Sequence, residues 1–268
     1  MCRLLGVVTR APVPLATALD ELAVPFAELS HEHHDGWGIA AWTGQAAGPR
    51  IVKDTAPAAG SGLWDETLTG PPADAALLHL RLASPGLPVA PGNTHPFTAG
   101  TFAFAHNGFF APYDALDELI DADLLAGAAG DTDSERYFLR VLTLLRDADP
   151  VDALARAAAD VRARASYASL NCLLLTEQAL YAYADEDPAS EPSRRRGPDF
   201  FRLRYRIDAD GGRVVVASSG LPQPEGEWSV LPYRQILEIR RSSLRVSVHR
   251  VAGDPRGRPR TAGAPHPA

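Results

Sequence analysis

Short apolar runs rich in β-branched residues dominate the first half of the chain. The first, Arg3–Thr9, predicts a buried strand that begins directly after Cys2. Helical spacing follows over Pro14–Leu29, where Pro25 is expected to kink or split the helix. Connections rich in proline and glycine then separate three further predicted strands: Gly36–Trp42, Ala76–Ala83 and Thr101–Phe109. The first half is therefore expected to be mainly sheet.

Helices precede a second group of strands in the other half. Thr132 and Glu135 form a Thr-x-x-Glu capping box that predicts a helix start. The three helices predicted from apolar spacing are Pro112–Leu125, Thr132–Arg146 and Pro150 to about Arg164. The later strands predicted are Ser169–Thr176, Leu180–Tyr183, Phe201–Ile207, Arg213–Ala217, Ile236–Arg240 and Leu244–Val251. The order of strands, helices and strands indicates an α+β protein.

Two segments lack the pattern of a packed element. Asp185–Pro198 is acidic and then basic with proline interruptions, so we expect an exposed loop without a chemical role. The stretch after Val251 is rich in glycine, proline and arginine, and residues 252–268 are expected to form a disordered tail. Residues 2–251 are then expected to form one domain.

Composition excludes several classes of protein. The 268 residues are 46% hydrophobic, enough to bury a full core, and the net charge of −7 argues against a nucleic-acid surface. Two cysteines are too few for a disulfide framework, which fits a reducing cytoplasm. The apolar run Leu4–Val8 is too short for a signal peptide, and no stretch reaches the roughly 20 apolar residues of a membrane span. We expect a cytoplasmic protein with no membrane contact.

Cys2 follows the initiator Met1 directly and becomes the N-terminal residue once Met1 is removed. An N-terminal cysteine carries a thiolate nucleophile together with an α-amine whose pKa of about 7.7 to 8.0 suits it to accept a proton. Position alone is weak evidence, because many proteins have a small second residue. An N-terminal nucleophile hydrolase is therefore a hypothesis that other residues must support.

Arg81 interrupts the apolar strand of the His79–Ser84 segment, and a charge in that setting needs a partner. It either closes a salt bridge at the strand end or binds a substrate carboxylate through both guanidinium nitrogens. Asn107-Gly108 is equally open: the pair is a strong signal for a type I′ hairpin turn, yet an amide and a glycine N–H are also the donors of an oxyanion hole. His106 beside them is expected to be structural.

Three further polar segments allow two interpretations each. Asp133 stands either in an acidic first turn that complements a helix dipole or opposite a substrate ammonium. The turn Asn93–Pro96, with His95, is either a proline-directed turn or a pocket wall. His31–Asp35 is rich in metal-ligand types, but its spacing matches neither His-Glu-x-x-His nor a cysteine-pair motif, so a plain loop is favoured over metal binding.

Taken in order, these motifs resemble the class II glutamine amidotransferase domain: Met1-Cys2-Arg3, Asp35-Gly36-Trp37-Gly38, His79–Ser84, Asn93–Pro96, His106-Asn107-Gly108 and Thr132–Glu135. The resemblance is strong from residue 2 to about residue 136. The chain is similar in particular to the stand-alone forms of that domain, a subgroup that includes the γ-glutamyl hydrolase of ergothioneine synthesis. The pair Ser84-Pro85 departs from the Thr-His common in the family.

The resemblance implies a four-layer αββα N-terminal nucleophile (Ntn) hydrolase sandwich of two antiparallel sheets. It implies that Cys2 is the nucleophile and that Asn107 and Gly108 form the oxyanion hole. It implies substrate contacts through Arg81 to the α-carboxylate and Asp133 to the α-ammonium, with Ser84 and His95 also in the binding site. No metal and no organic cofactor is required, because nucleophile, base and oxyanion donors suffice.

The expected reaction is cleavage of the γ-amide of glutamine or of a γ-glutamyl conjugate through a Cys2 thioester. The ammonia released from glutamine could pass to a partner synthase. Two other classes stay open: a metal-dependent hydrolase built on His31–Asp35, and a catalytically silent sensor of γ-glutamyl compounds.

Overall fold

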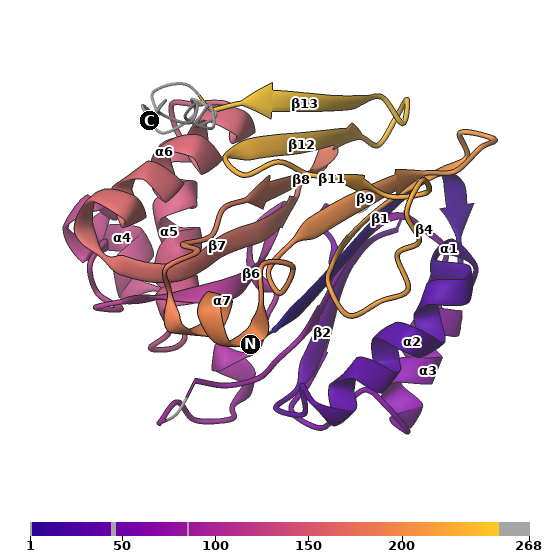
Figure 1. The fold of residues 1–268 in the computed structure, drawn as a ribbon, viewed down its shortest axis with the longest axis horizontal. Coiled ribbons are helices and arrows are strands. Elements are labelled where there is room, and N and C mark those ends of the chain that lie inside the picture. Colours follow the sequence, from indigo (N-terminus) through magenta and orange to yellow (C-terminus); the bar gives the residue numbers. More distant parts are fainter. Residues whose placement is uncertain (1, 44–46, 85, 252–268) are drawn as a thin grey trace, which may run out of the picture.

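The chain forms two antiparallel sheets packed face to face, with helices on both outer faces (Figure 1). The structure is a computed structural model that describes residues 2–43, 47–84 and 86–251. The seven-stranded sheet has the order β11 (Ser229–Val230), β9 (Leu203–Ile207), β10 (Arg213–Ser218), β1 (Arg3–Val13), β4 (Ala73–Leu80), β2 (Trp37–Trp42) and β3 (Arg50–Asp54). The six-stranded sheet has the order β13 (Val246–Arg250), β12 (Gln235–Arg240), β8 (Ala179–Ala184), β7 (Ser166–Leu175), β6 (Phe102–Ala111) and β5 (Phe97–Ala99).

Helices cover the outer face of each sheet. Those on the seven-stranded sheet are α1 (Leu15–Leu19), α2 (Ala23–Glu28) and α3 (Gly62–Thr69), and those on the six-stranded sheet are α4 (Ala122–Ala126), α5 (Asp133–Leu145) and α6 (Pro150–Arg164). A seventh helix, α7 (Glu191–Arg196), lies in the connection from β8 to β9. Single 3₁₀ turns are η1 (Asp20–Leu22), η2 (Leu29–His31), η3 (Pro91–Asn93) and η4 (Asp117–Leu119). The predicted α+β class and αββα sandwich are confirmed.

Strand alternation sorts the side chains into three apolar clusters. In β1, Leu4 and Val8 point between the two sheets, while Leu5 and Val7 point to the helices α1–α3. In β6, Ala103 and Ala105 likewise point between the sheets, and Phe104 points to α5. Because the period is two, Cys2 and Asn107 continue the inward-facing rows of their strands. The same pattern that builds the core therefore directs both side chains into the space between the sheets.

The start of α5 shows half of the predicted capping box. Thr132 caps the helix, because its Oγ1 accepts a hydrogen bond from the backbone N–H of Glu135 at 3.1 Å. The Glu135 carboxylate accepts hydrogen bonds instead from Ala129 N at 2.7 Å and Gly130 N at 2.8 Å. Glu135 thereby shapes the loop that leads into the helix.

Several predicted element bounds are wrong. The helix over Pro14–Leu29 is broken at Asp20, whose φ is 49°, and Pro25 lies without disruption in the first turn of α2, where its missing N–H has no intrahelical partner. Most of Pro112–Leu125 is irregular, with only η4 and α4 inside it. The elements α3, β3 and β5 were not predicted.

The segment Asp185–Pro198 is also less exposed than its composition suggested. It joins two strands as expected, but it contains α7, and Asp185, Glu186 and Ser193 are buried. Asp185 is held by Arg162, whose Nη1 lies 2.9 Å from Oδ2. The predicted tail, residues 252–268, lies outside the described residues.

Candidate active site

Cys2 and Arg81 lie at the ends of two neighbouring strands. In the antiparallel pairing of β1 with β4, Arg3 is opposite Leu80 and Leu4 is opposite His79, so the next step places Cys2 beside Arg81. The Cys2 thiol lies 3.8 Å from the carbonyl oxygen of Leu82. The side chain is 9% exposed, close to full burial. The strand ends therefore hold a thiol and a guanidinium side by side.

The electrostatic surroundings of Cys2 pull in two directions. Burial raises the pKa of the Cys2 thiol, while the positive charges of Arg81 and Arg3 lower it again. Burial also lowers the pKa of the Arg81 guanidinium, which the charges of Cys2 and Asp35 counteract. A thiolate at this position is accordingly favoured by the two arginines and disfavoured by the loss of water around it.

Arg81 is a buried cation with spare donor capacity. One nitrogen, Nη2, donates a 3.0 Å hydrogen bond to the carbonyl oxygen of Pro88, while the buried Nη1 has no hydrogen-bond partner among the described residues. Asp35 steadies the same loop, because its Oδ2 accepts a 2.7 Å hydrogen bond from Ala83 N. A buried guanidinium with an unused N–H is suited to bind an anionic group.

Asn107 and Gly108 lie in the middle of β6, so a hairpin turn at this pair is wrong. Asn107 on β6 pairs with Asn171 on β7, and the side chain of Asn107 is fully buried. Neither Oδ1 nor Nδ2 of Asn107 has a hydrogen-bond partner within the described part of the chain. Since buried amides are almost always paired, the free Asn107 amide marks a place where a bound group would complete the hydrogen bonding.

Gly108 is required by packing. A Cβ at this position would lie 1.9 Å from the backbone oxygen of Ser169 and 2.9 Å from Nε2 of His106. His106 in turn bridges Ser169 O and Ser134 Oγ, each at 2.9 Å. His106 is thus fully engaged in holding the helix start of α5 to the sheet, in agreement with a structural role.

One edge of β6 is open beside this pair. Strand β5 pairs only with Phe102–Phe104, so β6 has no strand neighbour on that side from Ala105 onward among the described residues. The N–H of Phe110 uses the open edge to bond Oδ2 of Asp133 at 2.9 Å. Gly108 lies two residues before Phe110 on the same strand, and no strand of the described residues covers this edge of β6 beside it.

Asp133 begins α5 and is buried, with 8% of its surface exposed. Burial raises the pKa of its carboxyl, and the neighbouring His106 and backbone N–H groups lower it. Its Oδ2 is occupied by Phe110 N, so the helix start is tied to the strand that carries Asn107. This contact therefore joins two segments predicted from sequence to belong to the site: the strand with Asn107 and Gly108, and the helix start with Asp133.

A stack of buried histidines connects these strands. The rings of His79 and His95 are 4.1 Å apart between centroids, and His95 lies 4.6 Å from the ring of Phe97. His79 faces the backbone of His106, the residue before Asn107. Burial lowers the pKa of both His79 and His95 well below 6.5. Two neutral imidazoles therefore link the Arg81 strand to the Asn107 strand.

Ser84 and the histidine-rich loop are placed differently from the other candidates. Ser84 lies exposed in the loop after β4. His31 forms a surface ion pair with Glu28 at 3.1 Å, while His33 is fully buried. Within the described ranges, no group of three or more His, Cys, Asp or Glu side chains is arranged to hold a metal ion. The metal alternative therefore has no geometric support in His31–Asp35.

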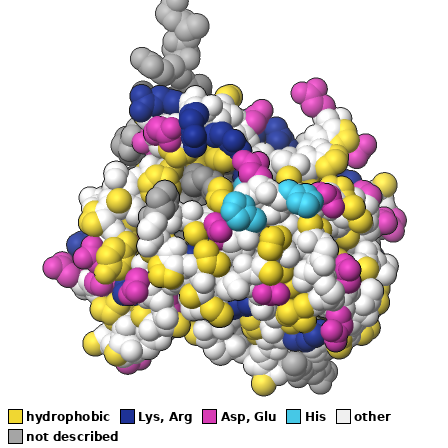
Figure 2. Space-filling model, turned by 90° about the horizontal axis from the view of Figure 1, so that it is seen from below, with side chains coloured by type: hydrophobic (Ala, Val, Ile, Leu, Met, Phe, Trp, Pro, Cys, Tyr) yellow, Lys and Arg dark blue, Asp and Glu magenta, His cyan; other side chains and the backbone are white. Residues whose placement is uncertain are grey.

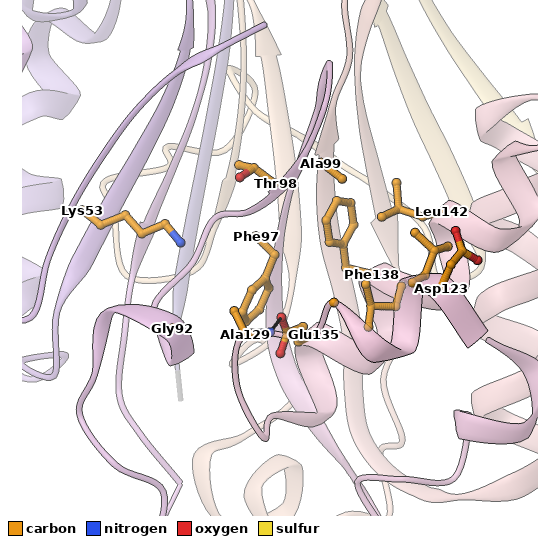
Figure 3. Close-up of a pocket in the computed structure, with 13 residues that line it drawn as sticks. Lys53, Gly92, Phe97, Thr98, Ala99, Asp123, Ala129, Glu135, Phe138 and Leu142 are labelled. Atoms are coloured by element: carbon orange, nitrogen blue, oxygen red, sulfur yellow. Dashed lines mark hydrogen bonds between the residues drawn. The ribbon is translucent and has the colours of Figure 1, made fainter. Parts of the chain in front are cut away.

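A pocket of about 260 Å³ opens next to the Pro91–His95 turn, between the edge strands and α5. Figure 3 shows Lys53 reaching toward Phe97 from one side and Glu135 bonded to Ala129 on the other. The Lys53 ammonium donates a 2.8 Å hydrogen bond to Thr94 O, which holds the turn that carries His95. Burial lowers the pKa of Lys53. Neither Arg81 nor Cys2 is among the residues that line this pocket.

The sequence matches the model of one family, the class II glutamine amidotransferases, over residues 1–224. The chain belongs to this family. The family predicted from the order of the motifs is thereby confirmed, and the chain is an enzyme of that family. No helix in the described ranges is long and apolar enough to cross a membrane.

Individual relatives agree with this assignment. A γ-glutamyl-hercynylcysteine sulfoxide hydrolase of Mycobacterium tuberculosis is 29% identical over 227 residues, which are 83% of this chain and 82% of that protein. Among solved structures, a glutamine aminotransferase class-II domain protein of Silicibacter pomeroyi superposes with a TM-score of 0.67 at 23% identity, covering 94% and 100% of the two chains. The phosphoribosylpyrophosphate amidotransferase of Bacillus subtilis gives 0.64 at 16% identity, covering 94% and 50%. These two structural similarities establish the shared fold.

Two further polar side chains, to which the sequence analysis assigned no contact of their own, lie beside Cys2 and Arg81. Arg3 is 4% exposed, and its Nη1 donates a 3.1 Å hydrogen bond to the carbonyl oxygen of Cys2. Asn93 supports the Arg81 loop, because its Nδ2 donates to Pro88 O at 3.3 Å. Arg3 could have been found by the argument applied to Arg81, since it too is a charge within an apolar strand.

Proposed function

We propose that this amidotransferase-family enzyme hydrolyses the γ-amide of glutamine or of a γ-glutamyl conjugate, with Cys2 as its nucleophile. The observation that carries the proposal is the placement of Cys2 beside Arg81, together with the buried amide of Asn107, which has no hydrogen-bond partner among the described residues. A nucleophile, an anion-binding group and an oxyanion donor are the parts that amide hydrolysis requires.

In the first half of the reaction, the Cys2 sulfur attacks the γ-carbonyl carbon after Met1 has been removed. The free α-amine of Cys2 takes the thiol proton, and the carbonyl oxygen gains negative charge. Asn107 Nδ2 and the Gly108 N–H donate to that oxygen. The C–N bond then breaks, and the leaving amine takes the proton from the α-ammonium of Cys2. A thioester on Cys2 remains.

In the second half, the α-amine of Cys2 accepts a proton from a water molecule that attacks the thioester. The C–S bond breaks, glutamate leaves, and the sulfur regains a proton. Arg81 binds the α-carboxylate of the substrate through its free Nη1, and Asp133 binds the α-ammonium. His95 forms part of the wall behind Arg81 through its stacking on His79. Ser84 contributes only from the exposed loop.

The leaving group decides between two versions of this activity. The Mycobacterium tuberculosis relative is a hydrolase of a γ-glutamyl conjugate, and its coverage of 83% of the chain favours a conjugate here. In the other version, ammonia from glutamine passes to a separate synthase. We further propose that residues 2–251 act as one domain and that the enzyme works in the cytoplasm, where reducing conditions keep Cys2 and Cys172 free.

The test is a screen for glutamate release from glutamine and a series of γ-glutamyl amides, comparing the native enzyme with Cys2→Ala. We expect release that Cys2→Ala abolishes, and an intact mass that lacks Met1. Retained activity in Cys2→Ala would overturn the proposed nucleophile. A retained Met1 together with no release from any substrate would favour the silent sensor.

A further inference from the structure

Arg3 occupies an unusual position for a cation, buried directly after the N-terminal cysteine. Its side chain is 4% exposed, and burial lowers its pKa. Its Nη1 donates to the Cys2 carbonyl oxygen at 3.1 Å, while the buried Nε has no hydrogen-bond partner among the residues described. Because burying a charge is costly unless the surroundings stabilise it, the contacts that hold Arg3 in place call for an explanation.

An aromatic ring from a distant segment holds the guanidinium. The Arg3 guanidinium carbon lies 4.9 Å from the ring centroid of Phe200, and that of Arg196 lies 4.8 Å from the same centroid. A Phe ring attracts a cation placed over its face, and more so where water is excluded. Phe200 thus contacts two arginines, one beside Cys2 and one at the end of α7.

A carboxylate completes the arrangement. Arg196 forms a hydrogen-bonded ion pair with Glu32, and the negative charge of Glu32 also acts on Arg3. The four residues come from β1, the loop after η2 and the connection from β8 to β9. In Figure 1 the N-terminal end lies beside α7, and Figure 2, which views that side, shows Lys and Arg side chains gathered with acidic ones beside them.

The backbone around Arg3 leaves little room for another position. Gly220 has a φ of +107°, and a Cβ there would lie 3.2 Å from Arg3 Nε and 3.2 Å from a methyl carbon of Leu29. A larger residue at Gly220 would therefore press against the guanidinium as well as adopt a strained conformation. The site of Arg3 is built closely around one side-chain placement.

We propose that Arg3, held by Phe200 and Glu32, both of which contact Arg196, is a positioning residue that fixes the backbone of Cys2 and so aims its thiol and amine at the substrate. The inference rests on the proposed function, in which Cys2 is the nucleophile. After removal of Met1, a single peptide bond attaches Cys2 to the chain, and terminal residues fray unless they are tied down. The hydrogen bond from Arg3 fixes the orientation of that peptide bond.

The same side chain assists the thiolate by its charge. The charged side chains that face Cys2 are Arg3 from β1 and Arg81 from the end of β4. A role in positioning therefore predicts two separable effects, one on geometry and one on the ionisation of Cys2. Arg3→Met removes both the hydrogen bond to Cys2 and the positive charge, whereas Arg3→Lys keeps the charge but not the forked donor geometry.

The experiment compares Arg3→Met, Arg3→Lys and the control Arg10→Met, an exposed arginine on the same strand. Steady-state kinetics are measured on the substrate found in the screen. The rate of Cys2 alkylation by iodoacetamide is followed by mass spectrometry from pH 6 to 10, with the fully buried Cys172 as internal reference. Folding of each variant is checked by thermal melting.

For Arg3→Met we expect kcat to fall by about 10²-fold, as for other small misplacements of reacting groups. We expect KM to change by less than about threefold. Its alkylation profile should move to higher pH. Arg3→Lys should restore the alkylation profile but not kcat, and Arg10→Met should match the native enzyme. Native kcat and alkylation profile in Arg3→Met would overturn the inference, as would loss confined to KM.

Phe200→Leu and Arg196→Gln provide a second route, which also decides the matter if Arg3→Met does not fold. Both should lower kcat in the same direction by a smaller factor and leave KM nearly unchanged; native kinetics in both would overturn the inference. Failure of the proposed function is recognised separately. In that case Cys2→Ala itself keeps activity, whereas failure of this inference alone leaves Cys2→Ala inactive and the Arg3 variants normal.

Discussion

The backbone N–H of Phe110 donates a 2.9 Å hydrogen bond to Oδ2 of Asp133. This bond ties the first residue of α5 to the strand that carries Asn107 and Gly108. The Asp133 carboxylate thus has a structural bond through Oδ2, in addition to the substrate contact proposed for it.

Asp133→Asn separates these two roles. The amide oxygen of asparagine can still accept from Phe110 N, but the negative charge is lost. We expect thermal stability close to that of the native enzyme and a fall in kcat/KM of about 10- to 100-fold, the range of a charge-assisted hydrogen bond of about 1.5–3 kcal/mol. Steady-state kinetics with a melting curve check this. An unchanged kcat/KM would assign Asp133 to structure only.

Asn107→Ala should damage catalysis without damaging the fold. The side chain has no hydrogen-bond partner among the described residues, so its loss leaves no protein group unsatisfied. We expect kcat to drop by about 10²- to 10³-fold, as for other oxyanion donors, with a urea midpoint equal to or above the native value.

Asn171→Ala is the matched control for Asn107→Ala, since the two residues are paired across β6 and β7. Asn171 donates to Phe201 O and accepts from Asp185 N at 2.9 Å. Truncation of Asn171 leaves two buried backbone groups without a hydrogen-bond partner and should cost about 1–3 kcal/mol of unfolding free energy. If Asn107→Ala showed the same pattern as Asn171→Ala, the amide of Asn107 would be structural.

Arg81→Lys tests the carboxylate contact. Lysine keeps the positive charge but cannot reach both Pro88 O and a substrate carboxylate with a planar fork. We expect KM to rise sharply, because such a contact contributes to binding in the ground and transition states alike. Kinetics on glutamine and on one γ-glutamyl conjugate are the measurement. A KM equal to the native value for both would mean that Arg81 only closes the strand end.

Gly108→Ala should destabilise the protein by about 3 kcal/mol, the upper end of overpacking effects. The added methyl group would lie 1.9 Å from Ser169 O, and a backbone atom within a sheet cannot move aside easily. Gly62→Ala is the control, because a Cβ there meets no atom within 4 Å. Urea unfolding of both variants measures the difference, and equal midpoints would contradict the packing described for β6.

Stability should fall on mild acidification. Burial lowers the pKa of His79, His95 and His106 in the folded state, so below about 6.5 the unfolded chain binds protons that the folded chain does not. The contribution is complete above that pH and declines as pH falls toward the lowered folded-state values, by up to about 1.4 kcal/mol per pH unit for each histidine. Urea midpoints between pH 7.5 and 5.5 measure it.

His79→Gln should reduce this acid dependence, and the exposed His31→Gln should leave it as it is. The comparison removes one buried imidazole in the first variant and one surface imidazole in the second. Equal slopes in the two variants would show that the buried histidines are not responsible.

Local patterns predicted the strands and the α+β class, and the family resemblance implied the sandwich, but the patterns did not reveal the meaning of the polar residues. The apolar runs around Cys2 and Ala105 gave strands and directed both side chains inward, because strand alternation is a local property. Asn107-Gly108 has the local signature of a turn, whereas the reason for the glycine is Ser169 O, contributed by a different strand. Information of that kind comes only from strand pairing.

Other differences have the same origin. The break at Asp20 and the place of Pro25 in a first turn depend on how α1 and α2 pack on the sheet, which apolar spacing alone does not reveal. Arg196 lies in the Asp185–Pro198 stretch, whose composition predicts a solvated loop, and Phe200 follows that stretch. Their contact with Arg3 arises only because the connection from β8 to β9 returns to the N-terminal end of the sheet.

Lys53 belongs to β3, the outermost strand of one sheet, and its ammonium bonds Thr94 O just ahead of β5, the outermost strand of the other. A single flexible side chain therefore fastens the two layers together along that flank. Neutralising it, by alkali or by acetylation, would loosen the seam at which the His95 turn rests, so hydrogen exchange in residues 91–99 should report on the charge of one lysine.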